Sequence, residues 1–278
     1  MEKVDLHSHT TASDGTFTPI ESIARARKNG LSALGITDHD TVAALSSAIE
    51  EGKKQGIEIV PGIEISSVHD GKDIHVLGYY IDYSDESFNQ QLESLRNVRN
   101  QRNQMIVEKL VELGIPITME EVKSRSTVKK GNIGRPHIAE VLMEKGVVSS
   151  IQEAFDQYLG QGKAAYANPP RITPLEAMRM IEEAGGVPVL AHPGLYDDVE
   201  LVEHLVAEGL KGIEVFHPDH SEADEKFYND IADRYGLIKT AGSDFHGMRN
   251  GEIFHGDLGE KSTTIEIVAR LKKLARVQ

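Results

Sequence analysis

Short apolar segments alternate with amphipathic helical segments along most of the 278 residues, and this alternation leaves few folds open. The segments with the length and composition of buried β-strands are residues 3–6, 33–37, 58–61, 74–79, 187–191, 212–216 and 238–241. Helical stretches at 19–29 and 173–184 are each followed by glycine, which favours a helix end. Repeated strand–helix units place strands in a parallel sheet covered by helices. The pattern therefore predicts an α/β barrel of seven strands.

The strand pattern stops between residues 91 and 163. Apolar residues there recur at spacings of mostly three and four, and they are Leu92, Leu95, Val98, Met105, Ile106, Leu110 and Leu113. This spacing is typical of helices. Thr118 and Ser150 each precede a glutamate by three residues, as in a capping box, so helices are expected to begin just after them. We therefore predict a barrel domain of residues 1–90 and 164–278 with a helical cap inserted at 91–163.

Charge and composition narrow the possible partners. The chain carries 30 Lys+Arg against 44 Asp+Glu, a formal net charge of −14, which argues against a basic surface for DNA or for anionic membranes. No apolar run approaches the roughly 20 residues of a membrane helix, and the first residues read as a strand, so we expect a protein of the cytoplasm. Because there is no cysteine, only His, Asp and Glu are left as metal ligands.

Side chains that can bind metals recur at the ends of the expected strands. They are His7, His9, Asp14, His39, Glu64, His75, His192, Asp244 and His246. The carboxyl ends of the strands in a parallel barrel meet at one rim, so residues far apart in the sequence can converge there. His7 and His9 are two residues apart and would point the same way on an extended segment, as would Asp244 and His246. The pattern predicts one shared metal site.

The donor set indicates the kind of metal. Six imidazoles and three carboxylates without sulfur suit Zn, Mn, Fe or Co, and Glu64 is a candidate bridge between two ions. A single histidine of this kind is more often structural, and His69, His204 and His255, which fall outside the pattern, are expected to be structural or solvated. Burying the whole set unpaired would cost several kcal/mol. The combination therefore predicts a polynuclear metal site.

Four motifs carry a family resemblance, and they are Asp-Leu-His-Ser-His at 5–9, Thr-Asp-His-Asp at 37–40, Ala-His-Pro at 191–193 and Ser-Asp-Phe-His at 243–246. Together with the segments around Glu64 and His75 they resemble the polymerase and histidinol phosphatase (PHP) family of metallophosphoesterases. The resemblance implies a distorted seven-stranded β/α barrel, similar to that of amidohydrolases, with a trinuclear site. In that site His7, His9, Glu64 and Asp244 would hold one ion, Glu64, His75 and His192 the second, and Asp14, His39 and His246 the third. Manganese is expected first, with zinc or iron as alternatives.

The insertion contains Arg-Asn-Gln-Arg at 99–102 and Gly-Arg-Pro-His-Ile-Ala at 134–139. With these segments it resembles the helical cap of the 3′,5′-nucleoside bisphosphate phosphatases, whose relatives also trim short RNA from the 5′ end. Pro136 fits the first turn of a helix, whose free N–H groups attract phosphate to Arg135 and His137. Arg99 and Arg102 lie three apart on one helix face and can add charge-assisted hydrogen bonds. We expect these four side chains to bind substrate.

The expected reaction is hydrolysis of the 3′-phosphate of a nucleoside 3′,5′-bisphosphate to a nucleoside 5′-monophosphate. His192 and Asp244 would act in catalysis through a metal-bound hydroxide, while the cap holds the 5′-phosphate. His217 and His220 follow the sixth strand, so they lie at the correct rim to contact substrate or donate a proton.

Three alternatives stay open at this point. The chain could be a histidinol phosphatase or another small phosphomonoesterase of the same family. It could be a 5′ to 3′ exoribonuclease acting on short single-stranded RNA, which can coexist with bisphosphatase activity. A noncatalytic metal-binding module is a third reading, which the complete ligand set disfavours.

Overall fold

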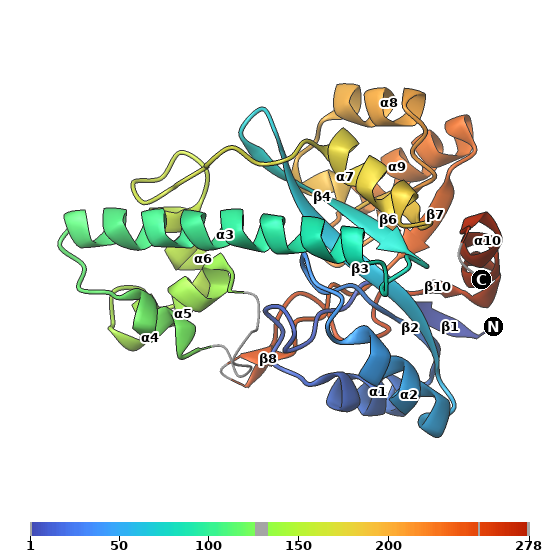
Figure 1. Ribbon diagram of the computed structural model, residues 1–278, viewed down its shortest axis with the longest axis horizontal. Coiled ribbons are helices and arrows are strands. Elements are labelled where there is room, and N and C mark those ends of the chain that lie inside the picture. The colour runs from blue at the N-terminus through green and yellow to red at the C-terminus, as the bar shows by residue number, and fades with distance from the viewer. Residues whose placement is uncertain (1, 126–132, 250, 277–278) are drawn as a thin grey trace.

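The computed structural model describes residues 2–125, 133–249 and 251–276. Its centre is an eight-stranded sheet in the order β10-β1-β2-β3-β4-β5-β6-β7 (Figure 1). The strands are β1 (Lys3–Asp5), β2 (Leu31–Ile36), β3 (Glu58–His69), β4 (Lys72–Tyr79), β5 (Val187–Leu190), β6 (Gly212–Phe216), β7 (Ile238–Ala241) and β10 (Thr263–Thr264). The seven strands expected from the sequence correspond to β1–β7, and β10 adds an antiparallel strand beside β1.

The sheet curls into a nearly closed barrel because the segments that follow β1 and β7 are bonded to each other. The backbone N–H of Leu6 donates to the carbonyl of Ala241 at 3.0 Å, and that of His9 donates to the carbonyl of Phe245 at 2.8 Å. Ser8 and Phe245 form a parallel bridge between the same segments. The α/β barrel is thus confirmed, and the residues that follow β1 and β7 lie side by side at one rim.

The direction of β4 differs from the expected parallel order, because β4 runs antiparallel to both β3 and β5. Only Asp70 and Gly71 separate β3 from β4, and both have positive φ, 48° and 78°. A connection of this length permits a hairpin but is too short for the crossover that parallel strands need. The expectation of an all-parallel sheet was therefore wrong. The reversal brings the beginning of β4, including His75, to the rim where β1 and β2 end.

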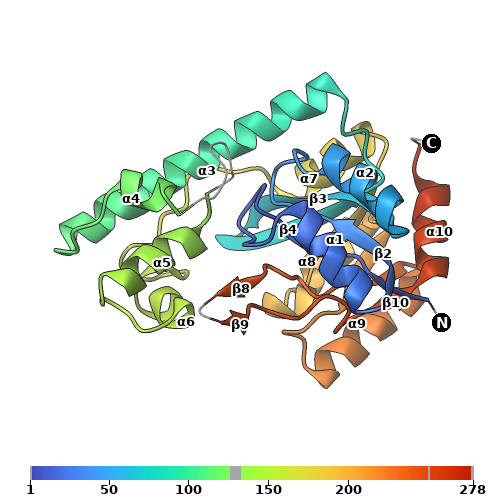
Figure 2. The ribbon, with the colours of Figure 1, turned by 90° about the horizontal axis from the view of Figure 1, so that it is seen from below.

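Amphipathic helices pack around the barrel and cover its apolar side chains (Figure 1, Figure 2). They are α1 (Pro19–Lys28), α2 (Leu45–Gln55), α7 (Pro174–Glu183), α8 (Val199–Ala207), α9 (Glu222–Tyr235) and α10 (Ile265–Leu274). α1 and α7 begin alike: Thr18 and Thr173 form capping boxes, and each is followed by proline in the first turn. Local sequence signals thus set the start of both helices.

The cap is built on α3 (Glu86–Glu112), whose two halves belong to different cores. Phe88 and Leu92 pack into the barrel core, whereas Ile106 and Leu110 pack with α4 (Met119–Lys123), α5 (Arg135–Glu144) and α6 (Ile151–Ala154). Figure 2 shows these three helices gathered at one end of α3. Although α3 has 27 residues, no helix in the described ranges is both long and apolar enough to cross a membrane. The division into domains at 91 and 163 stays a prediction.

Candidate metal centre

The nine side chains expected to bind metal converge at one rim of the barrel. His7 and His9 follow β1, His39 follows β2, and the backbone of His39 forms a bridge with Glu64 inside β3. Eight of the nine residues are buried, and His75 is partly buried. Their positions follow from the strand order, because each strand delivers its own ligands to the same place.

The extended segment after β1 aligns its two imidazoles as its spacing predicts. The Nε2 atoms of His7 and His9 lie 3.2 Å apart. Across from them, Asp244 and His192 have positive φ, 49° and 25°, which is uncommon for residues with a Cβ atom. Surrounding structure must enforce such conformations, and they concentrate at functional sites. The backbone here is therefore shaped to aim side chains inward.

Glu64 lies at the centre of the cluster. Its Oε2 is 3.3 Å from His7 Nε2, 3.1 Å from His9 Nε2 and 3.1 Å from His39 Nδ1. Its Oε1 is 2.8 Å from His75 Nδ1 and 3.1 Å from His192 Nε2. One carboxylate that faces imidazoles from several strands through both of its oxygens has the placement required of a bridging metal ligand.

The donor atoms fall into groups that could each hold one ion. Their atoms lie within 4.8 Å of one another in the sets His7, His9, Glu64, Asp244; His9, Asp14, His39, His246; and His39, Glu64, His75. Asp14 Oδ1, Glu64 Oε2 and Asp244 Oδ1 are buried and make no hydrogen bond to any residue that the structure describes. Buried lone pairs without donors would be costly unless a cation shares them. The residues therefore fit divalent metal ions.

The protonation states of several groups suit metal binding. Burial would raise the pKa of Glu64, but the surrounding imidazoles lower it well below its ordinary value. The same balance, with His39 and His246 as neighbours, lowers the pKa of Asp14. Burial also lowers the pKa of His39 and His192, despite the nearby Glu64. Ionised carboxylates and neutral imidazoles are the forms that bind metal.

The pKa of His9 is shifted in the opposite direction from those of His39 and His192, and this shift leads to a prediction about pH. Burial alone would lower its pKa, but the carboxylates of Asp244 and Glu64, each 3.1 Å from His9 Nε2, raise it to about 10. Below that pH His9 holds a proton that a metal ion must displace, so we expect the apparent affinity for Mn²⁺ to rise with pH across the neutral range. Titration calorimetry in buffers of different ionisation heat would measure the released protons. A pH-independent affinity would contradict this expectation.

Glu214, in β6, is a buried carboxylate that the sequence interpretation missed. His7 Nδ1 lies 3.0 Å from its Oε1, and the backbone N–H of His192 donates to its Oε2 at 3.0 Å. This contact fixes the ring of His7 so that Nε2 faces the metal ligands. The signal was available, because a charged residue interrupts the otherwise apolar Gly-Ile-Glu-Val-Phe strand.

Glu214→Gln should weaken metal binding by about 10- to 100-fold while the chain still folds. The amide keeps the shape of the side chain, but it offers one acceptor oxygen where two donors now bind. Competition with a metal indicator would measure the affinity. Glu203→Gln, at a glutamate of α8 bonded to the hydroxyl of Tyr235, is the matched control. Equal metal affinity in both variants would remove the role assigned to Glu214.

The three remaining histidines near the rim differ in what their ring nitrogens contact. His217 Nε2 is 3.4 Å from Asp244 Oδ2, so it adjoins the cluster. His220 accepts from the backbone N–H of Gly194 and donates to the carbonyl of Val215, so both of its nitrogens are engaged in holding loops together. His255 was expected away from the rim, yet it lines the same chamber as the metal ligands and contacts Asp219 at 2.8 Å.

A chamber of about 310 Å³ extends from the metal ligands to the cap. At the cap end it is lined by Arg99, Arg102, Arg135 and Phe155, and beside the rim by His255, which follows the hairpin of β8 (Met248–Arg249) and β9 (Glu252–Ile253). The chamber therefore joins a metal-binding end to a cationic end. Its volume is within the range of small-ligand sites.

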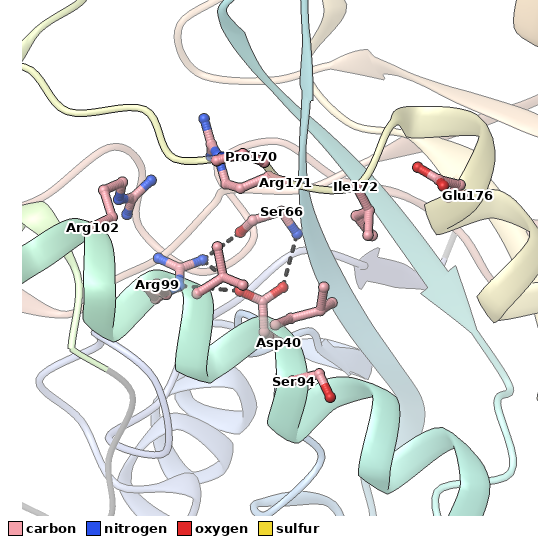
Figure 3. A pocket seen from close by; sticks show the side chains of 11 residues that line it. Asp40, Ser66, Ser94, Arg99, Arg102, Pro170, Arg171, Ile172 and Glu176 are labelled. Atoms are coloured by element: carbon pink, nitrogen blue, oxygen red, sulfur yellow. Dashed lines mark hydrogen bonds and ion pairs between the residues drawn. The ribbon is translucent and has the colours of Figure 1, made fainter.

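The four cap residues expected to bind phosphate are not equivalent. Arg99 donates to Asp40 from Nε at 3.1 Å and from Nη2 at 2.7 Å, and it also contacts Ser66 (Figure 3). Arg102 and Arg135 also line the chamber, and they make fewer hydrogen bonds than Arg99 does. His137 caps its own helix, because its Nδ1 accepts from the N–H of Gly134 at 3.1 Å, and it lines a smaller cavity instead.

Comparison with known proteins agrees with this geometry. The model of the PHP domain family matches residues 5–159. The chain is 37% identical to the 5′-3′ exoribonuclease Rnm of Escherichia coli, over 87% of this chain and 84% of that protein. It is 34% identical to a 3′,5′-nucleoside bisphosphate phosphatase of Chromobacterium violaceum, over 90% of each.

A solved structure of a candidate metal-dependent phosphoesterase from Bifidobacterium adolescentis superposes with a TM-score of 0.89 at 32% identity, over 98% of this chain and 96% of that one. The barrel, the His/Asp/Glu rim and these relatives define a metal-dependent hydrolase that acts on phosphate esters. The chain belongs to the PHP domain family.

Proposed function

We propose that this protein removes the 3′-phosphate from nucleoside 3′,5′-bisphosphates and releases nucleoside 5′-monophosphates. The observation that carries the proposal is the chamber itself, which places buried metal ligands at one end and Arg102 and Arg135 at the other. A substrate with two phosphates separated by a ribose matches a site with two anion-binding ends. The bisphosphate phosphatase of Chromobacterium violaceum, 34% identical to this chain, supports this choice of substrate.

We propose three divalent ions at the rim, with manganese as the first candidate and zinc or iron as alternatives. The ligand sets are those carried by the resemblance: His7, His9, Glu64, Asp244; Glu64, His75, His192; and Asp14, His39, His246. The clustering of these donors supports the assignment, with His9 and His39 near enough to be shared between sets. When bound, such ions lower the pKa of water and neutralise charge that develops on phosphoryl and leaving oxygens.

The side chains of the chamber would align the substrate. Arg102 and Arg135 would hold the 5′-phosphate, while Arg99, fixed by Asp40, forms the wall beside them. Phe155 lines the chamber and offers an aromatic face to the nucleoside. Anchoring both phosphates leaves the ribose little freedom, so binding energy from the remote phosphate is used to orient the reacting one.

His217 would contribute by holding Asp244. It is buried, its Nε2 lies 3.4 Å from Asp244 Oδ2, and its pKa is raised because the charges of Asp244 and Glu214 outweigh the effect of burial. His220 is a weaker candidate for contact with substrate, since the backbone occupies both of its ring nitrogens.

The assay that tests the proposal compares adenosine 3′,5′-bisphosphate, adenosine 3′-monophosphate and histidinol phosphate on the metal-replete protein. We expect the highest kcat/KM for the bisphosphate, with adenosine 5′-monophosphate as the product. Preference for histidinol phosphate would favour the small phosphomonoesterase instead. No turnover of any of them would favour a noncatalytic module.

A second candidate activity is 5′ to 3′ exoribonuclease action on short single-stranded RNA, which the relation to Rnm favours. The same chamber would hold the 5′-phosphate at the cap and the first phosphodiester at the rim. A 5′-phosphorylated, 3′-labelled short RNA would lose mononucleotides from its 5′ end.

We propose the cytoplasm as the location, since a chain without cysteines gains nothing from an oxidising compartment.

A further inference from the structure

Asp73 lies among three guanidinium groups that come from three separate segments. It stands near the beginning of β4, next to the turn of the β3–β4 hairpin. Its Oδ2 is 2.7 Å from Arg135 Nη2 at the start of α5, and its Oδ1 is 3.7 Å from Arg102 Nη1 on α3. Arg171, on the segment that returns from the cap to α7, contacts Oδ1 as well. One carboxylate of the barrel thus contacts α3, the start of α5 and the segment that returns from the cap to the barrel.

The charges of this cluster do not balance. Two guanidinium groups contact the carboxylate of Asp73 directly and a third lies 3.7 Å away, so one negative charge is shared by three cations. One carboxylate against three guanidiniums leaves the cluster cationic. Arg102 is only 4% exposed, and its Nε makes no hydrogen bond to any described residue. A buried guanidinium so poorly paired is costly and is ready to accept a further anion.

The three arginines face two cavities. Arg102 and Arg135 line the metal chamber, whereas Arg171 lines a neighbouring cavity of about 300 Å³ together with Arg99 and Arg102. Figure 3 shows Arg171 on the returning segment, opposite Arg99 and Arg102 on α3. Asp73 is not among the described residues that line either cavity. The carboxylate therefore contacts the arginines without occupying the space into which they face.

We propose that Asp73, itself paired with Arg171, is a positioning residue for phosphate recognition, which holds Arg102 and Arg135 in the geometry that selects substrates carrying a second phosphate. This inference rests on the proposed function. Without the carboxylate, three like charges at close range would repel one another. Long side chains would then spread over several rotamers, and ordering them again would cost binding energy.

Asp73→Asn tests this role, because it removes the charge and keeps the size of the side chain. On the metal-replete protein we expect KM for adenosine 3′,5′-bisphosphate to rise about tenfold or more. We expect kcat to change little, and kcat/KM for adenosine 3′-monophosphate to stay within about threefold. Asp233→Asn is the matched control, since Asp233 is an exposed residue of α9 that forms an ion pair with Lys239 of β7.

A binding measurement separates this inference from the proposed function. Calorimetry with adenosine 5′-monophosphate, which carries only the 5′-phosphate, should give about tenfold weaker binding to Asp73→Asn than to the wild type or the control. Unchanged binding would show that Asp73 does not position the arginines, and tighter binding would show that it competes with the phosphate, so either result overturns the proposal. Equal losses of kcat/KM on adenosine 3′,5′-bisphosphate and on adenosine 3′-monophosphate would also overturn it, because they would indicate a merely structural effect. If the wild type fails to hydrolyse the bisphosphate, the proposed function fails, and the nucleotide titration alone decides the role of Asp73.

Discussion

Glu64→Gln is expected to remove almost all activity and much of the bound metal. Both oxygens of Glu64 face imidazole nitrogens at 2.8 to 3.3 Å, so the amide must turn an N–H₂ group toward one set of ligands. The variant also loses one negative charge where cations gather. Losing several kcal/mol of charge stabilisation corresponds to about a thousandfold or more in kcat.

The measurements for Glu64→Gln are the rate on adenosine 3′,5′-bisphosphate and the metal content of the purified protein by mass spectrometry. Glu208→Gln serves as the control, because Glu208 is an exposed glutamate whose nearest cation, Arg179, is 3.9 Å away. A Glu64→Gln protein that keeps full metal occupancy and full activity would show that the rim is not the reacting centre. Loss of both properties in the control would point to a general folding defect.

The barrel could be predicted because its determinants are local. Strand segments, capping residues and the glycines that follow helices can each be read within a few residues. These signals located β1–β7, α1 and α7, and the starts of α4 and α6 after Thr118 and Ser150, although β3 runs on to His69, past the expected end at 61. Most of the expected metal ligands could be placed from the same information, since a strand end determines where the next side chain lies, but Glu64 and His75 lie inside β3 and β4.

The direction of β4 shows where that inference failed. Asp70-Gly71 is a strong hairpin signal, yet the repeated strand–helix pattern suggested that every strand would be parallel. The hairpin also explains how His75, in the first half of β4, lies beside Glu64 of β3 and shares a site with residues that follow other strands. A short connection constrains strand direction more strongly than the average pattern does.

Residues that act through distant contacts could not be read from the sequence. Asp73 meets Arg135 and Arg171 across 62 and 98 residues, and no local motif joins them. The residue type alone also misleads: His137 and His220 have suitable side chains, but nearby backbone groups engage their nitrogens. Only the folded chain shows which nitrogens remain available to a ligand.

Arg135→Ala should reduce activity much more on substrates that carry a 5′-phosphate than on substrates that lack it. The guanidinium lines the chamber, is fixed by Asp73 at 2.7 Å and lies 5.2 Å from the centre of the Phe155 ring. Removing it deletes a charge-assisted contact to the 5′-phosphate and leaves Asp73 underpaired. Loss of a buried charge partner costs on the order of 2–5 kcal/mol, so kcat/KM on adenosine 3′,5′-bisphosphate should fall about 100-fold or more.

The contrast with adenosine 3′-monophosphate makes Arg135→Ala decisive. That substrate lacks the 5′-phosphate, so its kcat/KM should change no more than about threefold if Arg135 acts through that group alone. Arg135→Lys keeps the charge but not the planar fork and should fall between wild type and alanine. Arg179→Ala, at an exposed arginine of α7, should match the wild type on both substrates. Equal losses on the two nucleotides would place Arg135 in the support of the fold instead of in recognition, because a general distortion of the chamber cannot distinguish a substrate by a group it lacks.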